Sequence, residues 1–304
     1  MKISKRKKKK LVKYLFTILA AVVCFIVGVI GDWDKIGDNL GLSQPAVTAE
    51  GKLEVHFIDV GNADCILVRQ EDKTMLIDAG ERKSKTTLQH HFDTYGVEKF
   101  DLVIATHPHA DHIGGMQYVL DNYPVERFVM SYMDEPPTTA SYENMLECLL
   151  EKDIPVDEAK PGAVYELGTA RLQILAPYES DEEANNVSVV TRLSFGDKSF
   201  LFTDDAETTV EKQLISGEYA IKADVLKMGH HGSNTSNSTA FLRQVAPDFA
   251  VITCGKNNSY GHPHQEVIDR LDGQRVEAYR TDIHGHIVFT TDGSTLSVTT
   301  RKED

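Results

Sequence analysis

Short apolar runs separated by turn-forming residues dominate the chain from Leu53 onward. Many carry β-branched and aromatic side chains, which is typical of strands that bury one or both faces. Paired runs meet at Asp72-Lys73, Gly196-Asp197 and Asp292-Gly293, where hairpin turns are expected. The predicted strands cover residues 53–60, 64–70, 73–79, 101–107, 127–132, 163–167, 170–176, 187–195, 198–204, 224–229, 249–254, 276–281, 286–291 and 295–300.

Helical periodicity fills the intervals between many of these strands. Apolar residues recur there at three- and four-residue spacing, and Met145, Leu146, Leu149 and Leu150 show the pattern best. The predicted helices cover residues 86–95, 114–122, 141–153, 207–216, 238–246 and 264–272. Strand meanders with interspersed helices favour a mixed α/β (α+β) domain in which two packed sheets are covered by helices.

The first 50 residues follow a different pattern. Seven basic side chains lie between Lys2 and Lys10, and the next 20 residues form a largely apolar run with one charge, Lys13, near its start. Twenty helical residues span about 30 Å, the thickness of a bilayer core. Because basic flanks stay in the cytoplasm, we predict a single-pass anchor in the cell membrane and an extracytoplasmic domain. The predicted divisions are a cytoplasmic segment 1–10, a transmembrane anchor 11–30, a linker 31–50 and a folded domain 51–304.

A cleaved signal peptide is the alternative for this N-terminal region. Residues 46–49, Ala-Val-Thr-Ala, resemble a cleavage site, although they lie far beyond the apolar run. The distance favours the uncleaved anchor.

Composition and charge narrow the classes of function. Hydrophobic residues make up 41% of the chain, which is sufficient for a globular core. Residues 31–304 hold 24 basic and 46 acidic side chains, a net charge of −22. This charge argues against a protein that binds nucleic acid by charge alone. The four cysteines are scattered without a C-x-x-C pair, which excludes a cysteine zinc finger and disfavours a disulfide scaffold.

The placement of histidines points to metal chemistry. His107, His109, Asp111 and His112 fall within six residues, directly after an apolar strand and before Gly114. A loop at the end of a strand lets these side chains converge, and imidazole nitrogen and carboxylate oxygen are natural ligands of Zn²⁺ and Mn²⁺. This spacing can serve two adjacent divalent ions. Asp59 and Asp78 are candidates to orient the ligands. Five other histidines lack a partner at ligand spacing and are interpreted as structural or exposed: His56, His90, His91, His284 and His286.

The H-x-H-x-D-H pattern resembles the metallo-β-lactamase superfamily, and the resemblance implies a four-layer αββα sandwich. It also implies a metal-bridging aspartate at the end of a later strand. Asp205 fits that place, while Asp204 stands where the superfamily usually has glycine. The last histidine ligand falls on the pair His230-His231; we select His230 as the ligand and interpret His231 as its hydrogen-bonding neighbour.

More narrowly, the chain resembles the hydrolase domain of the ComEC/Rec2 competence proteins. The resemblance covers roughly residues 53–292, and it implies a free-standing, single-span relative because one span cannot form a DNA channel. The matching motifs are residues 57–65, 76–80, 112–115, 185–188, 229–233 and 260–264.

Two positions depart from the expected patterns. Many members of the narrower family have aspartate where this chain has His109, and the wider superfamily has a third histidine where this chain offers Asn185-Asn186. No histidine occurs from 113 to 229. The implied ligands are His107, His109 and Asp205 for one ion and Asp111, His112, Asp205 and His230 for the other, with Zn²⁺ or Mn²⁺ as the metal.

These residues predict a membrane-anchored, metal-dependent hydrolase. Two metal ions can activate a water as hydroxide and stabilise charge on a phosphoryl oxygen. Asp111 is expected to accept a proton. The loops expected to face the same opening hold His262, His264, Lys227, Ser233 and Asn234, and Lys227 and His264 are selected as contacts to phosphate. By resemblance the reaction is that of a phosphodiesterase or nuclease acting on DNA.

Two alternatives remain open. One is an esterase for a cell-surface phosphodiester of the choline-bearing or teichoic-acid type. The other is a non-catalytic, metal-binding sensor domain. A β-lactamase proper is disfavoured by the missing third histidine. The sequence predicts a membrane and a phosphodiester substrate as partners and identifies no protein partner.

Overall fold

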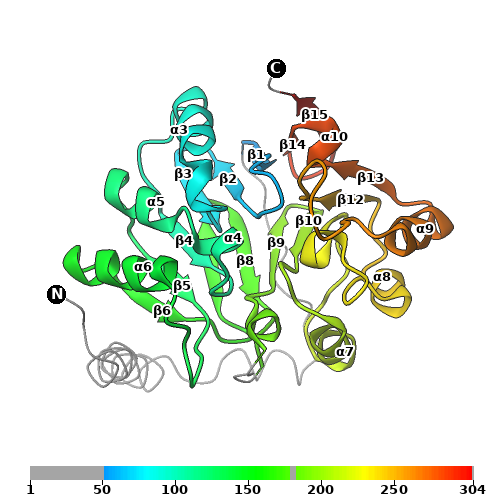
Figure 1. Ribbon diagram of the computed structural model, residues 1–304. Coiled ribbons are helices and arrows are strands. Elements are labelled where there is room, and N and C mark those ends of the chain that lie inside the picture. Colours follow the sequence, from blue (N-terminus) through cyan, green and yellow to red (C-terminus); the bar gives the residue numbers. More distant parts are fainter. Residues whose placement is uncertain (1–50, 179–182, 303–304) are drawn as a thin grey trace, which may run out of the picture.

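The computed structural model describes residues 51–178 and 183–302, which contain two packed β-sheets (Figure 1). The first sheet has eight strands in the order β15-β14-β1-β2-β3-β4-β5-β6, and the second has seven in the order β13-β12-β11-β10-β9-β8-β7. The strands of the first sheet are β1 (Leu53–Phe57), β2 (Ile66–Gln70), β3 (Lys73–Ile77), β4 (Leu102–Ala105), β5 (Phe128–Met130), β6 (Val156–Glu158), β14 (His286–Thr291) and β15 (Leu296–Arg301). Those of the second are β7 (Val164–Leu167), β8 (Ala170–Ile174), β9 (Thr191–Phe195), β10 (Lys198–Phe202), β11 (Val225–Lys227), β12 (Phe249–Ile252) and β13 (Glu277–Arg280).

Helices cover the outer face of each sheet (Figure 1). Those on the first sheet include α3 (Lys85–Thr94), α5 (Met116–Asn122) and α6 (Ala140–Glu151), and those on the second include α7 (Thr208–Ser216), α8 (Thr239–Val245) and α9 (Gln265–Gln274). The shorter elements are α4 (Ala110–Ile113), α10 (Thr281–His284), η1 (Arg82–Ser84), η2 (Ala184–Val187) and η3 (Gly229–Gly232).

Three apolar interfaces separate the layers. One lies between the helices of the first half and their sheet, one between the two sheets, and one between the second sheet and its helices. Along β10, Phe200 and Phe202 pack between the sheets while Leu201 packs under the helices. Both faces of the strand are therefore buried, which explains its continuous apolar run. The predicted αββα sandwich is confirmed.

Strand direction places the functional loops at one edge. The β3-β4 pair is parallel, and so are β10-β11 and β11-β12. The carboxyl ends of parallel neighbours meet at the same edge, so the loops that follow β4, β10, β11 and β12 can share one site.

All six predicted helices are present, with ends shifted by a few residues. The sequence reading missed β6, a three-residue edge strand, and the single turns α4 and α10. In the described part of the chain, no helix is both long and apolar enough to cross a bilayer. The predicted segments 1–10, 11–30 and 31–50 lie outside the described residues.

Candidate metal centre

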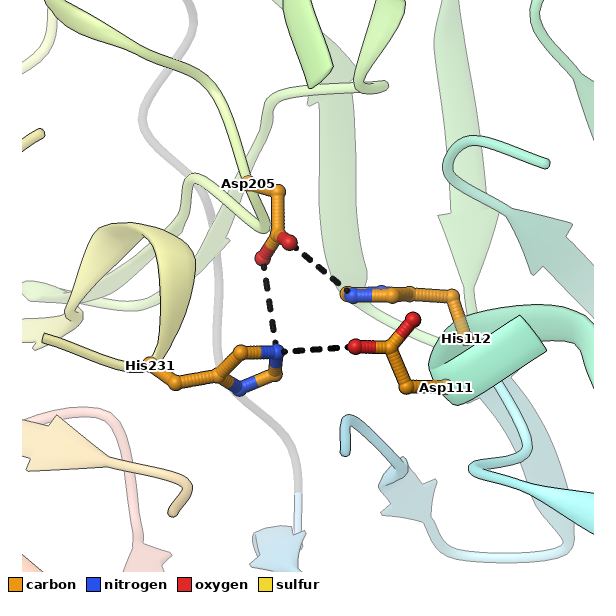
Figure 2. A group of neighbouring side chains, drawn as sticks. All are labelled: Asp111, His112, Asp205 and His231. Atoms are coloured by element: carbon orange, nitrogen blue, oxygen red, sulfur yellow. Dashed lines mark ion pairs between the residues drawn. The ribbon is translucent and has the colours of Figure 1, made fainter. Parts of the chain in front are cut away.

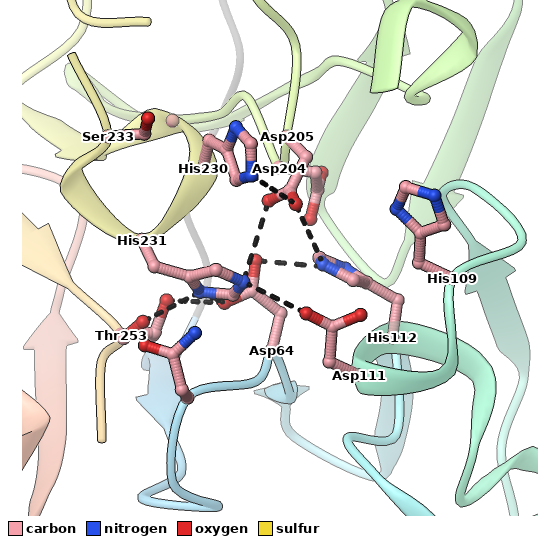
Figure 3. A network of polar contacts seen from close by, with 12 residues as sticks. Asp64, His109, Asp111, His112, Asp204, Asp205, His230, His231, Ser233 and Thr253 are labelled. Carbon is pink, nitrogen blue, oxygen red and sulfur yellow. Dashed lines mark hydrogen bonds and ion pairs between the residues drawn. The ribbon is translucent and has the colours of Figure 1, made fainter. Parts of the chain in front are cut away.

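The loop after β4 carries the first group of site residues. His107 is buried and its Nε2 lies 3.0 Å from Nδ1 of the exposed His109. The chain then enters α4, which presents Asp111 and the buried His112. The histidine motif is thus an extended loop followed by one helical turn, and Asp111 and His112 on that turn point toward Asp205 (Figure 3).

Asp205, directly after β10, joins the two halves of the site. One of its carboxylate oxygens lies 3.4 Å from Nε2 of His112 and 3.8 Å from Nε2 of His107. Asp204 precedes it with φ of +46°, the left-handed region that favours glycine, and its side chain belongs to a different group with Asp64 and Asp78. The backbone therefore directs Asp205, and not Asp204, toward the histidines.

The positions of His230 and His231 differ from the predicted assignment of ligand and hydrogen-bonding neighbour. Nε2 of His231 lies 3.5 Å from Asp111 and 3.7 Å from Asp205, and its side chain is 1% exposed (Figure 2). His230 also approaches Asp205, at 3.7 Å, but it is 24% exposed and its other nitrogen contacts Thr235. Both residues have positive φ, so the chain turns tightly here and drives His231 inward.

The geometry gives a ligand grouping that differs from the predicted one at one position. Ligand atoms within 4.8 Å of one another form two groups that share Asp205. One contains His107 and His109 with Asp205, and the other contains Asp111, His112, Asp205 and His231. His231 takes the place for which His230 was selected.

Hydrogen bonds behind the histidines orient their rings. Asp78 accepts from Nδ1 of His112 at 2.6 Å and is itself held by the backbone and hydroxyl of Thr106. The carbonyl of Thr253 accepts from Nδ1 of His231 at 2.8 Å. In both rings Nδ1 carries the proton, so Nε2 has its lone pair directed at the site when the ring is neutral.

The inner atoms of this site are suited to a cation. Among residues 51–178 and 183–302, Nε2 of His112, Nε2 of His231 and Oδ1 of Asp205 are buried without a hydrogen-bond partner. Buried polar atoms are normally satisfied, and three such atoms around one point constitute a binding cradle. The donor set of imidazole nitrogen and carboxylate oxygen fits Zn²⁺ and Mn²⁺.

The buried side chains of Asp205 and His231 stay ionised because they face one another. Burial opposes ionisation of Asp205, but His112 and His231 hold its pKa well below the usual value. Burial likewise opposes a charge on His231, but Asp205 and Asp64 raise its pKa to about 10. Without an added cation, these histidines are themselves the positive partners of the carboxylates.

Lys227 is placed differently from the prediction. It ends β11 with its side chain fully buried between the sheets, and its Nζ lies 2.5 Å from Asp64. Nζ also donates to the carbonyl of Met228 at 3.1 Å. The predicted contact with phosphate at the opening is wrong, because Val225 packs between the sheets and Lys227, two residues later, points the same way.

His264 also lies outside both ligand groups. It precedes α9, and its Nδ1 accepts a hydrogen bond from the backbone of Asn234 at 3.0 Å. Its neighbour His262 lines the opening of about 310 Å³ above the site, together with His109, Asp111 and His230. Of the two histidines expected at the opening, His262 lines it, whereas His264 anchors the neighbouring loop.

The segment expected to replace the third histidine lies next to the motif. η2 contains Asn185 and Asn186, and just after it the backbone of Val189 donates to Thr106, the residue before His107. Asn185 donates to Glu207 at 3.2 Å. This contact ties the asparagine segment to the loop that follows Asp205.

Sequence reasoning missed three supporting residues: Asp64, His231 as an inward side chain, and Thr253. Asp64 lies in a motif that resembles the competence proteins, and a carboxylate beside a buried apolar run was the available signal. Thr253 acts partly through its backbone, which leaves no mark in the sequence. Figure 3 shows these groups around the site.

Curated relatives match most of the chain. ComE operon protein 3 of Bacillus subtilis (strain 168) is 33% identical over 266 residues, 81% of this chain and 34% of the relative. Competence protein ComA of Neisseria gonorrhoeae is 29% identical over 252 residues, 81% of this chain and 33% of the relative. The chain therefore spans about a third of the length of these relatives. The predicted resemblance to competence proteins is confirmed.

Solved structures share the fold. The metallo-β-lactamase fold protein YhfI from Bacillus subtilis superposes with a TM-score of 0.54 at 14% identity, covering 79% of this chain and 100% of that one. The family described as "Metallo-beta-lactamase superfamily" matches residues 58–256, which include every ligand of the two groups. With this match and the 33% identity to a curated relative, the chain belongs to the metallo-β-lactamase superfamily.

Proposed function

We propose that this metallo-hydrolase is a membrane-anchored phosphodiesterase or nuclease whose catalytic domain lies outside the cytoplasm. The observation that carries the proposal is the cradle of unpartnered atoms on His112, His231 and Asp205. The superfamily binds divalent metals, typically two, and the two ligand groups around Asp205 suit a pair of ions. The basic segment and apolar run of residues 1–30 support the anchor.

The proposed ligands of the first ion are His107, His109 and Asp205, and those of the second are Asp111, His112, Asp205 and His231. Such ions would lower the pKa of a water and stabilise negative charge developing on a phosphoryl oxygen.

Asp111 is the candidate proton acceptor. Burial opposes its ionisation, but the neighbouring His231, 3.5 Å away, and His112 hold its pKa at about 2, so the carboxylate is ionised at neutral pH. It lines both the opening and the metal centre, where it can orient a water and accept its proton. Removal of this carboxylate should slow hydrolysis more than it weakens substrate binding.

His262 and His230 line the opening and are the proposed contacts to substrate there. In the described part of the chain, Nδ1 of His262 is buried without a hydrogen-bond partner. Burial and the charge of His231 lower the pKa of His262 to about 4, so its ring is neutral at pH 7. A neutral imidazole can donate one hydrogen bond to a phosphate oxygen.

The names of the curated relatives support DNA as the substrate. They include a competence protein and, in Haemophilus influenzae, Recombination protein 2, which is 29% identical over 242 residues. A cell-surface phosphodiester of the teichoic-acid type remains the second candidate, favoured by the proposed location and by the acidic body of the chain.

The test uses the full chain in detergent with Mn²⁺ or Zn²⁺. Single-stranded DNA, duplex DNA and poly(glycerol phosphate) are offered as substrates, and His112→Ala serves as the control without a complete metal site. Metal-dependent cleavage that the control lacks would support the proposal. Retained metal without hydrolysis of any phosphodiester would instead support a sensor domain.

A further inference from the structure

An exposed aromatic side chain lies beside the metal centre and belongs to neither proposed ligand group. Tyr260 stands in the loop between β12 and α9 and is 66% exposed, more than any other large apolar side chain of the described residues. It lines the opening above the metal centre and also a wider groove that continues from it. An aromatic ring left in water at the mouth of a site is a candidate contact for a ligand.

Near-parallel rings connect this tyrosine to the metal centre. The ring of Tyr260 lies 5.6 Å from that of His262 at an interplanar angle of 22°. His262 in turn lies 6.3 Å from His231 at 29°. The row of rings runs from His231, a proposed metal ligand, to Tyr260 at the surface. A flat group of a bound molecule, stacked on Tyr260, would continue this row.

The loop that carries Tyr260 is held in place. The side chain of Asn258 accepts from the backbone nitrogen of His262 at 3.0 Å and donates to its carbonyl at 2.6 Å. At the loop's other end, a Cβ on Gly255 would lie 2.7 Å from the backbone nitrogen of Asn62, so the two loops pack backbone against backbone. Tyr260 is thus presented on a fixed support, which lowers the entropy lost on binding.

The groove beside Tyr260 has a volume of about 910 Å³ and brings basic side chains together. Lys256 lies on the same loop as Tyr260, and Arg82 and Lys83 come from η1. Glu81 also lines the groove and pairs with Lys83 at 2.9 Å. Asp111 lies at the boundary with the metal centre. Exposed basic residues in a groove of an otherwise acidic chain indicate an anionic ligand.

We propose that this groove binds single-stranded nucleic acid, with a base stacked on Tyr260 and backbone phosphates contacting Arg82 and Lys256. The inference rests on the proposed phosphodiesterase function and specifies its substrate. Stacking on aromatic rings combined with basic contacts to the backbone is how single strands are bound without sequence preference. A duplex keeps its bases stacked internally, and a polyol phosphate has no ring to offer Tyr260.

The experiment compares two strands of equal length and charge. Fluorescein-labelled oligothymidylate and a strand whose sugars lack bases are bound to the full chain in detergent, with EDTA present so that neither is hydrolysed. Fluorescence anisotropy gives the two dissociation constants. Tyr260→Ala should weaken oligothymidylate binding roughly tenfold and leave the abasic strand unchanged, because stacking requires a base. Tyr260→Phe should bind like the unmodified chain.

Basic contacts are tested on the same strands. Lys256→Ala should weaken both strands alike and reduce the slope of log affinity against log salt by about 0.7. Lys212→Ala, on the outer helix α7, is the matched lysine control and should change neither value. The metal content of each variant is measured separately and should not change.

Equal affinity of the unmodified chain for the two strands would overturn the inference, as would a Tyr260→Ala effect of the same size on both. Because binding is measured without metal, this result is separate from the proposed function. A chain that hydrolyses phosphodiesters but does not favour bases would retain the function and lose the inference. A chain that favours bases but hydrolyses nothing would lose the function.

Discussion

Two groups of buried histidines lie in this domain, and their surroundings differ. His107, His112 and His231 surround Asp205 in the metal centre. On the outer face of the first sheet, His56 and His286 pack under α3 against His91. In this second group Nδ1 of His56 lies 3.2 Å from Nε2 of His91, and the ring of Tyr95 lies 4.7 Å from that of His91.

One histidine from each group, His91 and His231, shows pKa shifts in opposite directions. Burial, followed by the charge of His56, lowers the pKa of His91 to about 2. His231 is at least as deeply buried, yet Asp205 and Asp64 raise its pKa to about 10. Glu54 is the acidic neighbour of the second group; it contacts His56 at 3.5 Å and is partly exposed. The comparison teaches that buried histidines indicate a cation site only where buried carboxylates face them.

The largest expected difference between the groups is in metal-dependent hydrolysis. Asp205→Ala removes the ligand that both proposed ions share, so the rate should fall at least about a thousandfold, since bound metal supplies several kcal/mol of transition-state stabilisation. His91→Phe should change the rate less than about twofold, because it alters packing away from the site. Rates and metal content are measured together; equal losses in the two variants would contradict the comparison.

The next largest expected effect is the difference in metal affinity between variants of His230 and of His231. His231→Ala should lower metal affinity about a hundredfold or more, because it removes a buried nitrogen of the proposed cradle. His230→Ala should lower it less than about tenfold, as expected for a side chain at the rim. Isothermal titration with Zn²⁺ measures both, and the reverse order of effects would restore the assignment made from the sequence.

A smaller effect is expected behind the metal centre. Asp78→Asn weakens the hydrogen bond that orients His112 and should reduce metal affinity about 10- to 100-fold. Asp101→Asn is the matched control, because Asp101 precedes β4 and pairs with Lys73 and Lys99 away from the site. Unchanged affinity in Asp78→Asn would show that the ring of His112 needs no support.

The smallest effect concerns His91, whose ring is neutral in the folded protein. His91 cannot accept a proton when folded, but it can when unfolded, with an ordinary pKa near 6.5. The unfolded state therefore binds more protons below pH 6.5, and stability falls as the pH falls. From pH 7.5 to 5.5 the metal-free protein should lose about 1.4 kcal/mol that His91→Phe does not lose. Urea unfolding at both pH values provides the measurement, and parallel losses would show that His91 is already charged.

The sequence predicted the layers well, because strands buried on both faces and helices with one apolar face leave strong patterns. It missed β6 because Val156–Glu158 offers one apolar residue in three. The four-residue histidine motif was readable because its members are adjacent in sequence. The choice between His230 and His231 was not readable, because the positive φ at both residues follows from tertiary packing and not from their identity.

Lys227 shows a second limit of the sequence. A lysine at the end of a short strand resembles a surface contact, and only its position between the sheets reveals the pairing with Asp64. The alternation from Val225 was the available signal, but lysine is so rarely buried that composition argues against it.

The buried ammonium of Lys227 has a consequence for the charge balance inside the protein. It neutralises Asp64 beneath the candidate metal centre, and the raised pKa values of His112 and His231 supply further positive charge around Asp205. The chain thus supplies buried positive charge of its own to Asp64 and Asp205, so these carboxylates have cationic partners within the fold itself.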